Sequence, residues 1–137
     1  MVNEIKNYLK NKNIVLLGNA KSILNNKKDI DRFDVICRIN KSLPKGKEKY
    51  IGSRTDVLFI ATKLPDYKIK IFNTKFIIWT TPDKDYEDHY IMDCGIQLPT
   101  DYWYELQRQI GEKLPSTGFV VINFLLKYIE FKSLTIY

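Results

Sequence analysis

The sequence has few of the residues and runs that mark several large protein classes. Only two of its 137 residues are cysteine, which excludes a disulfide-stapled scaffold. Cys37 and Cys94 lack CxxC spacing, so we expect free thiols in a reducing compartment and no structural zinc. The longest mostly apolar stretch, Phe119 to Leu126, is far shorter than the roughly 20 residues that cross a bilayer. Residues 1–12 are polar and lysine-rich, without the apolar segment of a secretory signal.

What is present fits one globular domain. Hydrophobic residues make up 45% and charged residues 28% of the chain, and its length suits a single domain with a real core. Residues 1–54 carry 13 Lys and Arg against 5 Asp and Glu, whereas residues 55–137 carry 9 against 11. The basic half fits an anionic partner, such as a phosphorylated small molecule, nucleic acid or a membrane surface; the simpler alternative is a solvated lysine-rich surface. No nucleic-acid-binding motif is visible, so we expect no nucleic-acid partner and leave peripheral membrane contact open.

Apolar runs alternate with amphipathic segments along the chain. The runs predict strands buried on both faces at Ile14–Leu17, Phe33–Ile39, Asp56–Ala61, Lys75–Thr80 and Leu134–Tyr137. Periodicity and capping residues predict helices at residues 2–11, 21–26, 101–110 and 117–130, the last apolar on nearly every side and therefore buried. Residues 41–50 and 81–98 are expected to be loops. This order predicts one α/β domain over residues 1–137 with a mainly parallel sheet; because the chain stops inside a predicted strand, we expect it to be part of a longer polypeptide.

Two predicted strand ends carry residues suited to phosphate or ribose. Gly18 directly follows the first strand and lets the backbone approach a phosphate, with Asn19 and Ser22 as side-chain donors. A single glycine satisfies neither the dinucleotide-binding nor the Walker A pattern, so an ordinary turn is the alternative. Asn40 ends the second strand, where open α/β sheets bind ligands, and Arg38 is expected to face the same side. An asparagine is also common in strand-end turns.

Two further segments combine polar groups with a turn. Arg54 and Asp56 are expected to form an ion pair, with contact between Arg54 and an anionic ligand as the alternative. Ser116 and Thr117 stand at the head of a predicted helix, where hydroxyls and free N–H groups attract a carboxylate or phosphate. Simple N-capping is the alternative there. Gly118 in the first turn costs helix stability, which suggests close approach by a ligand or by another backbone segment.

Two features look like catalytic machinery and are interpreted otherwise. Asp83 and Asp85 form the DxD pattern by which many glycosyltransferases hold a divalent metal, but they lie in an acidic stretch that we interpret as a solvated loop. His89 is the only histidine, and histidine is the side chain best suited to act as a general base near neutral pH. It lies among acidic residues and nothing places it beside the glycine turn. We therefore expect no metal site and no catalytic role for His89.

Four segments in this order resemble a known family. VLLGNAKSIL, DRFDVICRINKS and IGSRTDVLFI resemble the long sialyl motif of glycosyltransferase family 29, the eukaryotic-type sialyltransferases. LPSTGFVVINFLLKYIEFKSLTIY resembles the short sialyl motif of the same family. The resemblance covers residues 13–62 and 114–137. Bacterial sialyltransferases of family 42 share a weaker version of the pattern.

This resemblance implies a Rossmann-like variant of the glycosyltransferase A fold, here without its C-terminal part. It implies transfer of sialic acid from CMP-sialic acid to a glycan hydroxyl, with inversion and without a metal or other cofactor. The partners would be a nucleotide-sugar donor and a glycan acceptor. Asn19 matches the residue that contacts the donor phosphate, and Asn40 matches the one on the cytidine side. The full set of implied donor-binding residues is Gly18, Asn19, Ala20, Ser22, Asn40, Ser116, Thr117 and Gly118.

The chain also departs from that family. Ile14 and Ile129 stand where the family has the disulfide that joins its two motifs, so we expect this contact to persist as apolar packing. Loss of the bridge and of a membrane anchor agrees with a cytoplasmic protein. The family's catalytic histidine lies downstream of the short motif, and the sequence ends at Tyr137 before that point. Two hypotheses follow: a sialyltransferase-like enzyme, or a truncated or degenerate module that binds CMP or another nucleotide without catalysis.

Overall fold

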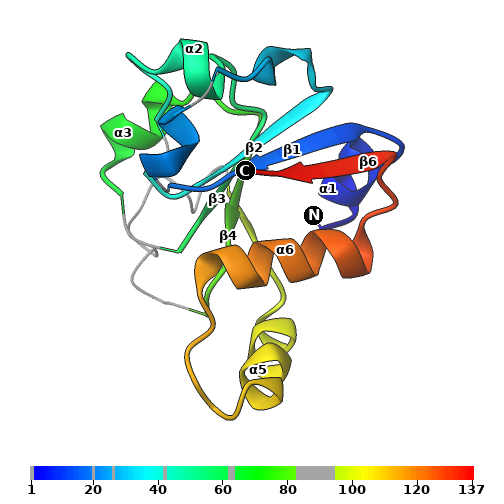
Figure 1. Cartoon of the computed structure of the whole chain (residues 1–137). Coiled ribbons are helices and arrows are strands. Elements are labelled where there is room, and N and C mark those ends of the chain that lie inside the picture. The colour runs from blue at the N-terminus through cyan, green and yellow to red at the C-terminus, as the bar shows by residue number, and fades with distance from the viewer. Residues whose placement is uncertain (1, 20, 26, 42, 62–63, 83–94) are drawn as a thin grey trace.

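The computed structural model describes residues 2–19, 21–25, 27–41, 43–61, 64–82 and 95–137. These residues form a six-stranded sheet in the order β5-β4-β3-β2-β1-β6, in which every pair of neighbours is parallel (Figure 1). The strands are β1 (Asn13–Leu17), β2 (Val35–Ile39), β3 (Val57–Ile60), β4 (Phe76–Trp79), β5 (Gly95–Gln97) and β6 (Ser133–Ile136). The predicted Rossmann-like α/β class with a parallel sheet is confirmed.

Helices cover both faces of this sheet (Figure 1). One face packs against α1 (Val2–Leu9), α5 (Thr100–Gln109) and α6 (Thr117–Tyr128). The other face packs against two 3₁₀ helices and two short α-helices, namely η1 (Lys21–Asn25), η2 (Ile30–Arg32), α2 (Glu48–Ile51) and α3 (Asp66–Ile71). In the described part of the chain, no helix combines the length and the apolarity needed to cross a bilayer.

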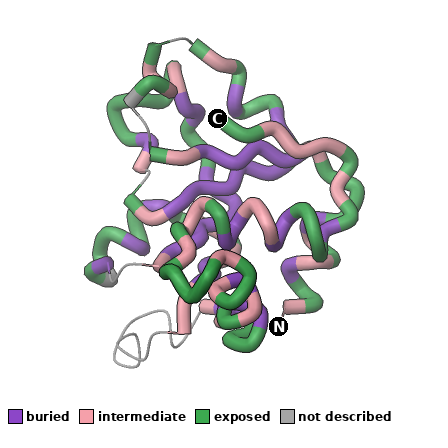
Figure 2. The backbone as a smooth tube through the Cα atoms, turned by 60° about the horizontal axis from the view of Figure 1, so that its bottom comes forward, coloured by how far each residue is buried: buried purple, intermediate pink, exposed green. Residues whose placement is uncertain are grey.

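Alternating side chains along β1 to β4 supply apolar clusters on both faces of the sheet. On β1, Ile14 and Leu16 join the apolar cluster beneath α1, α5 and α6, whereas Val15 and Leu17 join the cluster on the opposite face. Because both faces are covered there, β1 to β4 are buried along most of their length, as the purple segments of Figure 2 show. Ile14 and Ile129, which stand where the family that the sequence resembles has its disulfide, are both buried in the same apolar cluster.

Short elements account for most differences from the predicted secondary structure. The predicted loops contain part of α2 and all of β5, and neither α3 nor η2 was predicted. The expectation that the helix beginning at Thr117 is buried holds for one of its sides only. The side chain of Leu126 is 62% exposed and that of Phe119 is 39% exposed, because only one side of α6 packs on the sheet.

The direction of strand succession reverses beside β1. From β1 to β5 each strand is added next to the previous one, and the chain then crosses back to place β6 on the free side of β1. In open α/β sheets, ligands bind in the crevice that such a reversal opens at the carboxyl ends of the strands. Gly18 and Asn19 follow β1 directly, so the reversal places them at this point of the edge.

Candidate functional site

Two asparagines tie neighbouring strand ends together at the carboxyl edge of the sheet. Asn19 Nδ2 donates to the carbonyl of Ile39 at 3.2 Å, and Asn40 Oδ1 accepts from the N–H of Ala61 at 2.8 Å. Asn40 has a φ of 52°, in the left-handed region that asparagine tolerates. The side-chain alternation of β2 therefore stops at Ile39, and the expectation that Arg38 shares the orientation of Asn40 is wrong. The two amides bring the ends of β1, β2 and β3 into one row.

The close approach at Gly18 is to the backbone at Tyr137. Its N–H donates to the carbonyl of Tyr137 at 3.0 Å, and a Cβ on Gly18 would lie 3.5 Å from the same oxygen. This N–H therefore extends the pairing of β1 with β6, and the backbone expected to approach a phosphate lies against the carbonyl of Tyr137. Ser22 is exposed on η1, and Ala20 lies outside the described residues.

Ser116 caps the start of α6, and the space beside Gly118 in its first turn is open. Ser116 Oγ accepts from the N–H of Phe119 at 3.2 Å, which confirms N-capping. A Cβ built on Gly118 would meet nothing within 4 Å. No other backbone segment among the described residues therefore explains this glycine, and the alternative of a close ligand remains. The positive end of the helix dipole and the hydroxyl of Thr117 stand beside this open space.

A cavity of about 610 Å³ joins the start of α6 to the ends of β3 and β4 and to one side of α5. It is lined by Ala61, Thr81, Pro82, Trp103, Tyr104, Gln107, Leu114, Pro115, Ser116 and Thr117. Ala61 is also the residue that Asn40 holds, so the cavity adjoins the row of strand ends. None of these ten residues carries a charge at neutral pH; their polar groups are hydroxyls, an amide and an indole. Its volume lies in the range of small-molecule sites.

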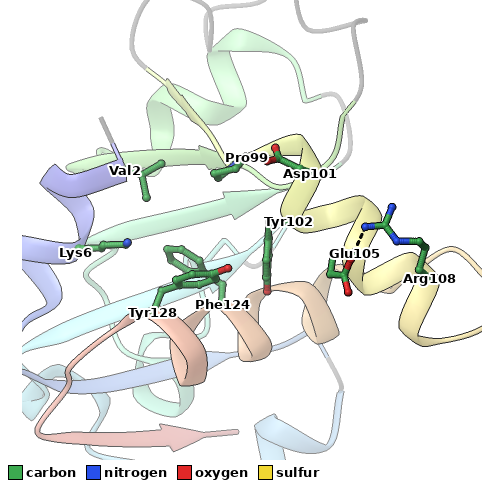
Figure 3. A pocket seen from close by; sticks show the side chains of 9 residues that line it. All are labelled: Val2, Lys6, Pro99, Asp101, Tyr102, Glu105, Arg108, Phe124 and Tyr128. Atoms are coloured by element: carbon green, nitrogen blue, oxygen red, sulfur yellow. Dashed lines mark hydrogen bonds and ion pairs between the residues drawn. The ribbon is translucent and has the colours of Figure 1, made fainter.

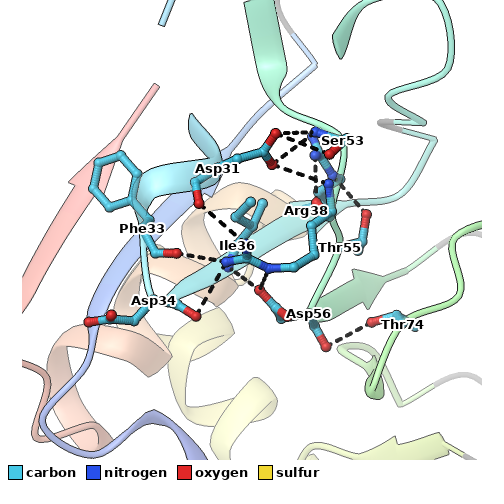
Figure 4. Close-up of polar contacts among 10 residues, drawn as sticks. Asp31, Phe33, Asp34, Ile36, Arg38, Ser53, Thr55, Asp56 and Thr74 are labelled. Atoms are coloured by element: carbon cyan, nitrogen blue, oxygen red, sulfur yellow. Dashed lines mark hydrogen bonds and ion pairs between the residues drawn. The ribbon is translucent and has the colours of Figure 1, made fainter. Parts of the chain in front are cut away.

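The Arg54–Asp56 pair lies at the other edge of the sheet, where β2 and β3 begin (Figure 4). Asp56 Oδ2 accepts from Arg54 Nε at 2.9 Å and from the N–H of Ile36 at 2.8 Å. Arg54 also donates to the carbonyl of Phe33 at 2.6 Å. The expected ion pair is confirmed, and these contacts identify it as a structural clasp between the amino ends of two strands.

Arg38 is fully buried and serves the same clasp (Figure 4). Its Nε donates to Thr55 Oγ1 at 2.8 Å and its Nη2 donates to the carbonyl of Arg54 at 2.7 Å. Burial lowers the pKa of its guanidinium to about 10, although the charges of Asp31 and Asp56 act in the opposite direction. Arg38 thus holds the segment before β3 against β2 and does not face the cavity.

A second cavity, of about 340 Å³, opens between α1, α5 and α6 (Figure 3). Tyr102, Phe124 and Tyr128 form its aromatic wall, and Glu105 and Arg108 on α5 are paired with each other at its rim. Burial raises the pKa of the Tyr102 phenol. Its O–H donates to the carbonyl of Val120 on α6 at 3.0 Å. None of the residues singled out in the sequence lines this cavity.

Trp103, Tyr104 and Gln107 form the α5 wall of the larger cavity and were not predicted as site residues from the sequence. Their spacing places them on one side of a helix, but only the packing of α5 shows that this side meets the cavity. Asp83, Asp85 and His89 lie outside the described residues. Within the described ranges, no group of three or more His, Cys, Asp and Glu side chains is placed to hold a metal ion.

Comparisons with known proteins found no match for this chain among protein-family models, curated proteins or solved structures.

Proposed function

We propose that the chain binds the CMP portion of CMP-sialic acid at the carboxyl edge of its sheet. It would act as the donor-binding domain of a sialyltransferase-like glycosyltransferase, which transfers sialic acid to a glycan hydroxyl with inversion. The observation that carries the proposal is the cavity at the start of α6, which places Ser116 and Thr117 beside the strand ends. The resemblance to the sialyl motifs suggests the identity of the donor, and the cavity supports this edge of the sheet as its binding site.

The chemistry of the site suits a nucleotide that leaves as an anion. The first N–H groups of a helix have no partner within that helix and point toward any ligand at its start. The 12-residue α6 adds the positive end of its dipole, and Thr117 adds a neutral hydroxyl donor. Fixed neutral donors of this kind stabilise charge that develops on a leaving phosphate without a metal ion.

Binding without catalysis is the second candidate, and one observation favours it. None of the ten residues that line the cavity has an imidazole or a carboxylate, the usual groups of a general base. A chain that binds CMP but releases none from CMP-sialic acid in the presence of glycan acceptors would support this candidate. Release of CMP coupled to sialylation of the acceptor would eliminate it.

Isothermal titration of the chain with CMP, and with UMP and AMP for comparison, tests the proposal. We expect CMP to bind most tightly. Thr117→Val removes the hydroxyl but keeps the side-chain shape, and we expect it to weaken CMP binding about three- to tenfold. Thr135→Val, on β6 and away from the cavity, is the matched control and should bind as the wild type does. Absence of CMP binding by a chain shown to be folded by circular dichroism would refute the proposal.

A further inference from the structure

The helix α3 carries apolar side chains on two of its sides. Ile69 within it and Phe72 at its end are buried in the apolar cluster that α3 shares with the sheet. Tyr67 and Ile71, in contrast, are 63% and 53% exposed. Because these two residues are four positions apart, they lie on one side of the helix and form an exposed apolar strip. Single exposed apolar residues are common, but a contiguous apolar surface indicates a binding site.

The exposed strip continues into an apolar groove. The groove has a volume of about 210 Å³ and lies between α3 and the segment that follows β2. Tyr67 and Ile71 line it as exposed residues, and Leu64 and Phe72 line it as buried ones. Leu43, from the segment after β2, completes the apolar lining. The two exposed side chains are therefore part of a larger apolar surface that no other described residue covers.

Lysines surround this groove. The charged residues that line it are Lys41 and Lys68, and both are exposed. Two more exposed lysines follow Leu43 closely in the chain: Lys45 and Lys47. Within the described ranges, none of these four lysines forms an ion pair with a carboxylate. Glu48, the one acidic residue among residues 41–50, accepts instead from the N–H of Gly46 at 2.9 Å. The apolar groove thus lies within a basic surface.

A partner for this surface must be anionic and must also accept apolar side chains. A bilayer that contains anionic lipids combines these properties, because acyl chains lie directly beneath its charged headgroups. Tyrosine rings favour this boundary, and lysine stems can lie along apolar surface while their ammonium groups reach phosphate. A nucleic acid would match the lysines alone, since its backbone offers nothing to an aliphatic side chain such as Ile71.

We propose that this basic apolar surface, formed by α3, Lys41 and residues 43–47, binds bilayers that contain anionic lipids. α2, which begins directly after these residues, and α3 cover the same face of the sheet (Figure 1). Tyr67 and Ile71 would enter the headgroup region, and the four lysines would contact lipid phosphates. Each lysine close to an anionic bilayer strengthens binding about fivefold. None of these residues lines the cavity at the start of α6, so the inference does not depend on the proposed function.

Sedimentation with lipid vesicles tests the apolar contact. The full chain should bind vesicles made of an equimolar mixture of phosphatidylcholine and phosphatidylserine, and it should bind them less as salt is added. It should not bind vesicles of phosphatidylcholine alone. The double variant Tyr67→Ser, Ile71→Ser should bind the mixed vesicles at least about tenfold more weakly. Leu126→Ser is the matched control and should bind as the wild type does, because Leu126 is 62% exposed on α6, on the other face of the sheet.

Charge reversal tests the lysines separately. The double variant Lys45→Glu, Lys47→Glu should also bind the mixed vesicles at least about tenfold more weakly. The control Lys113→Glu, Lys127→Glu makes the same change in net charge at exposed positions before and on α6. We expect this control to stay within about threefold of the wild type. Circular dichroism shows whether each variant is folded.

The outcomes that would overturn the proposal are distinct. Equal binding to both kinds of vesicle, or binding to neither by the folded chain, would overturn it. Equal losses from the two charge reversals would show that net charge acts without this surface. Unchanged binding by Tyr67→Ser, Ile71→Ser would remove the apolar contact, and tighter binding to a short oligonucleotide than to the mixed vesicles would assign the lysines to a nucleic acid. Failure of CMP to bind would overturn the proposed function and leave this inference standing, since vesicle binding is measured without nucleotide.

Discussion

Replacing Gly118 with alanine should move stability and nucleotide binding in opposite directions. Gly118 is the second residue of α6, and a Cβ there would meet nothing within 4 Å. The substitution therefore introduces no clash in the ligand-free protein. Alanine is favoured over glycine in a helix by about 0.5–1 kcal/mol, which corresponds to a rise in Tm of about 2–5 °C for a chain of this size.

We expect binding to weaken because Gly118 directly follows Thr117, which lines the cavity, and a ligand held close to the first turn of α6 would meet the new methyl group. A nucleotide seated at the start of α6 would lie against the Gly118 backbone, and a Cβ would displace it. We expect at least about tenfold weaker binding of CMP, equivalent to about 1.4 kcal/mol. Thermal unfolding and titration of the same preparation measure both effects. Leu126→Ala, at an exposed position further along α6, is the control for changes in the helix alone and should leave CMP affinity unchanged.

Two results would refute this reasoning. A Gly118→Ala protein that is stabilised and still binds CMP like the wild type would show that no ligand comes close to this glycine. A protein that is destabilised would show that the space beside Gly118 is not open in solution.

Three further predictions concern the clasp and the α5–α6 contact. Asp56→Asn should lower the free energy of unfolding by about 2–3 kcal/mol, because the buried carboxylate accepts from Arg54 and from the N–H of Ile36. Urea denaturation measures this loss, and a loss below about 0.5 kcal/mol would contradict the prediction. Burial acts to raise the pKa of Asp31, but the N–H groups of Ser53 and Arg54 outweigh it and hold that pKa below 3.8. The contribution of the Asp31 carboxylate to stability is therefore present above about pH 4 and lost as the pH falls through the lowered pKa. Asp31→Asn should destabilise the protein at pH 7 and flatten its acid denaturation profile. An unchanged profile would count against a stabilising role for this carboxylate. Burial raises the pKa of the Tyr102 phenol above 10.0, so its contribution is present below pH 10 and lost as the pH rises through the raised pKa. Tyr102→Phe should cost about 1 kcal/mol at neutral pH and make the alkaline decline less steep, and an equally steep decline would rule out this phenol as its cause.

The buried strands were predictable because helices cover both faces of the sheet. A strand with two buried faces is apolar throughout, as Ile14–Leu17 is, and such a run needs no knowledge of its neighbours to be found. The helix α3 could not be found in this way. Its apolar residues Tyr67, Ile69 and Ile71 alternate with lysines, a pattern typical of a strand, and only Ile69 is buried. In β5 only Ile96 is buried, which is too weak a signal for a strand.

The candidate site was predictable only where local sequence determines position. Asn19 and Asn40 follow strands, and the carboxyl ends of parallel strands share one edge of a sheet. Their hydrogen-bond partners, Ile39 and Ala61, are backbone groups about 20 residues away, and no local pattern identifies such partners. Trp103 enters the site through the docking of α5, which depends on tertiary packing.

The pairing of β6 with β1 also affects the order in which the protein can fold. Ser133 Oγ donates to Asn13 Oδ1 at 2.7 Å across 120 residues of sequence. Contacts so distant in sequence carry a large loop-closure entropy, which is recovered only when the second strand docks. During synthesis β1 can pair with β2 early, but its other side stays open until the residues of β6 have left the ribosome. A nascent chain before that stage would present the apolar β1 as an unpaired edge, available to chaperones and prone to aggregation.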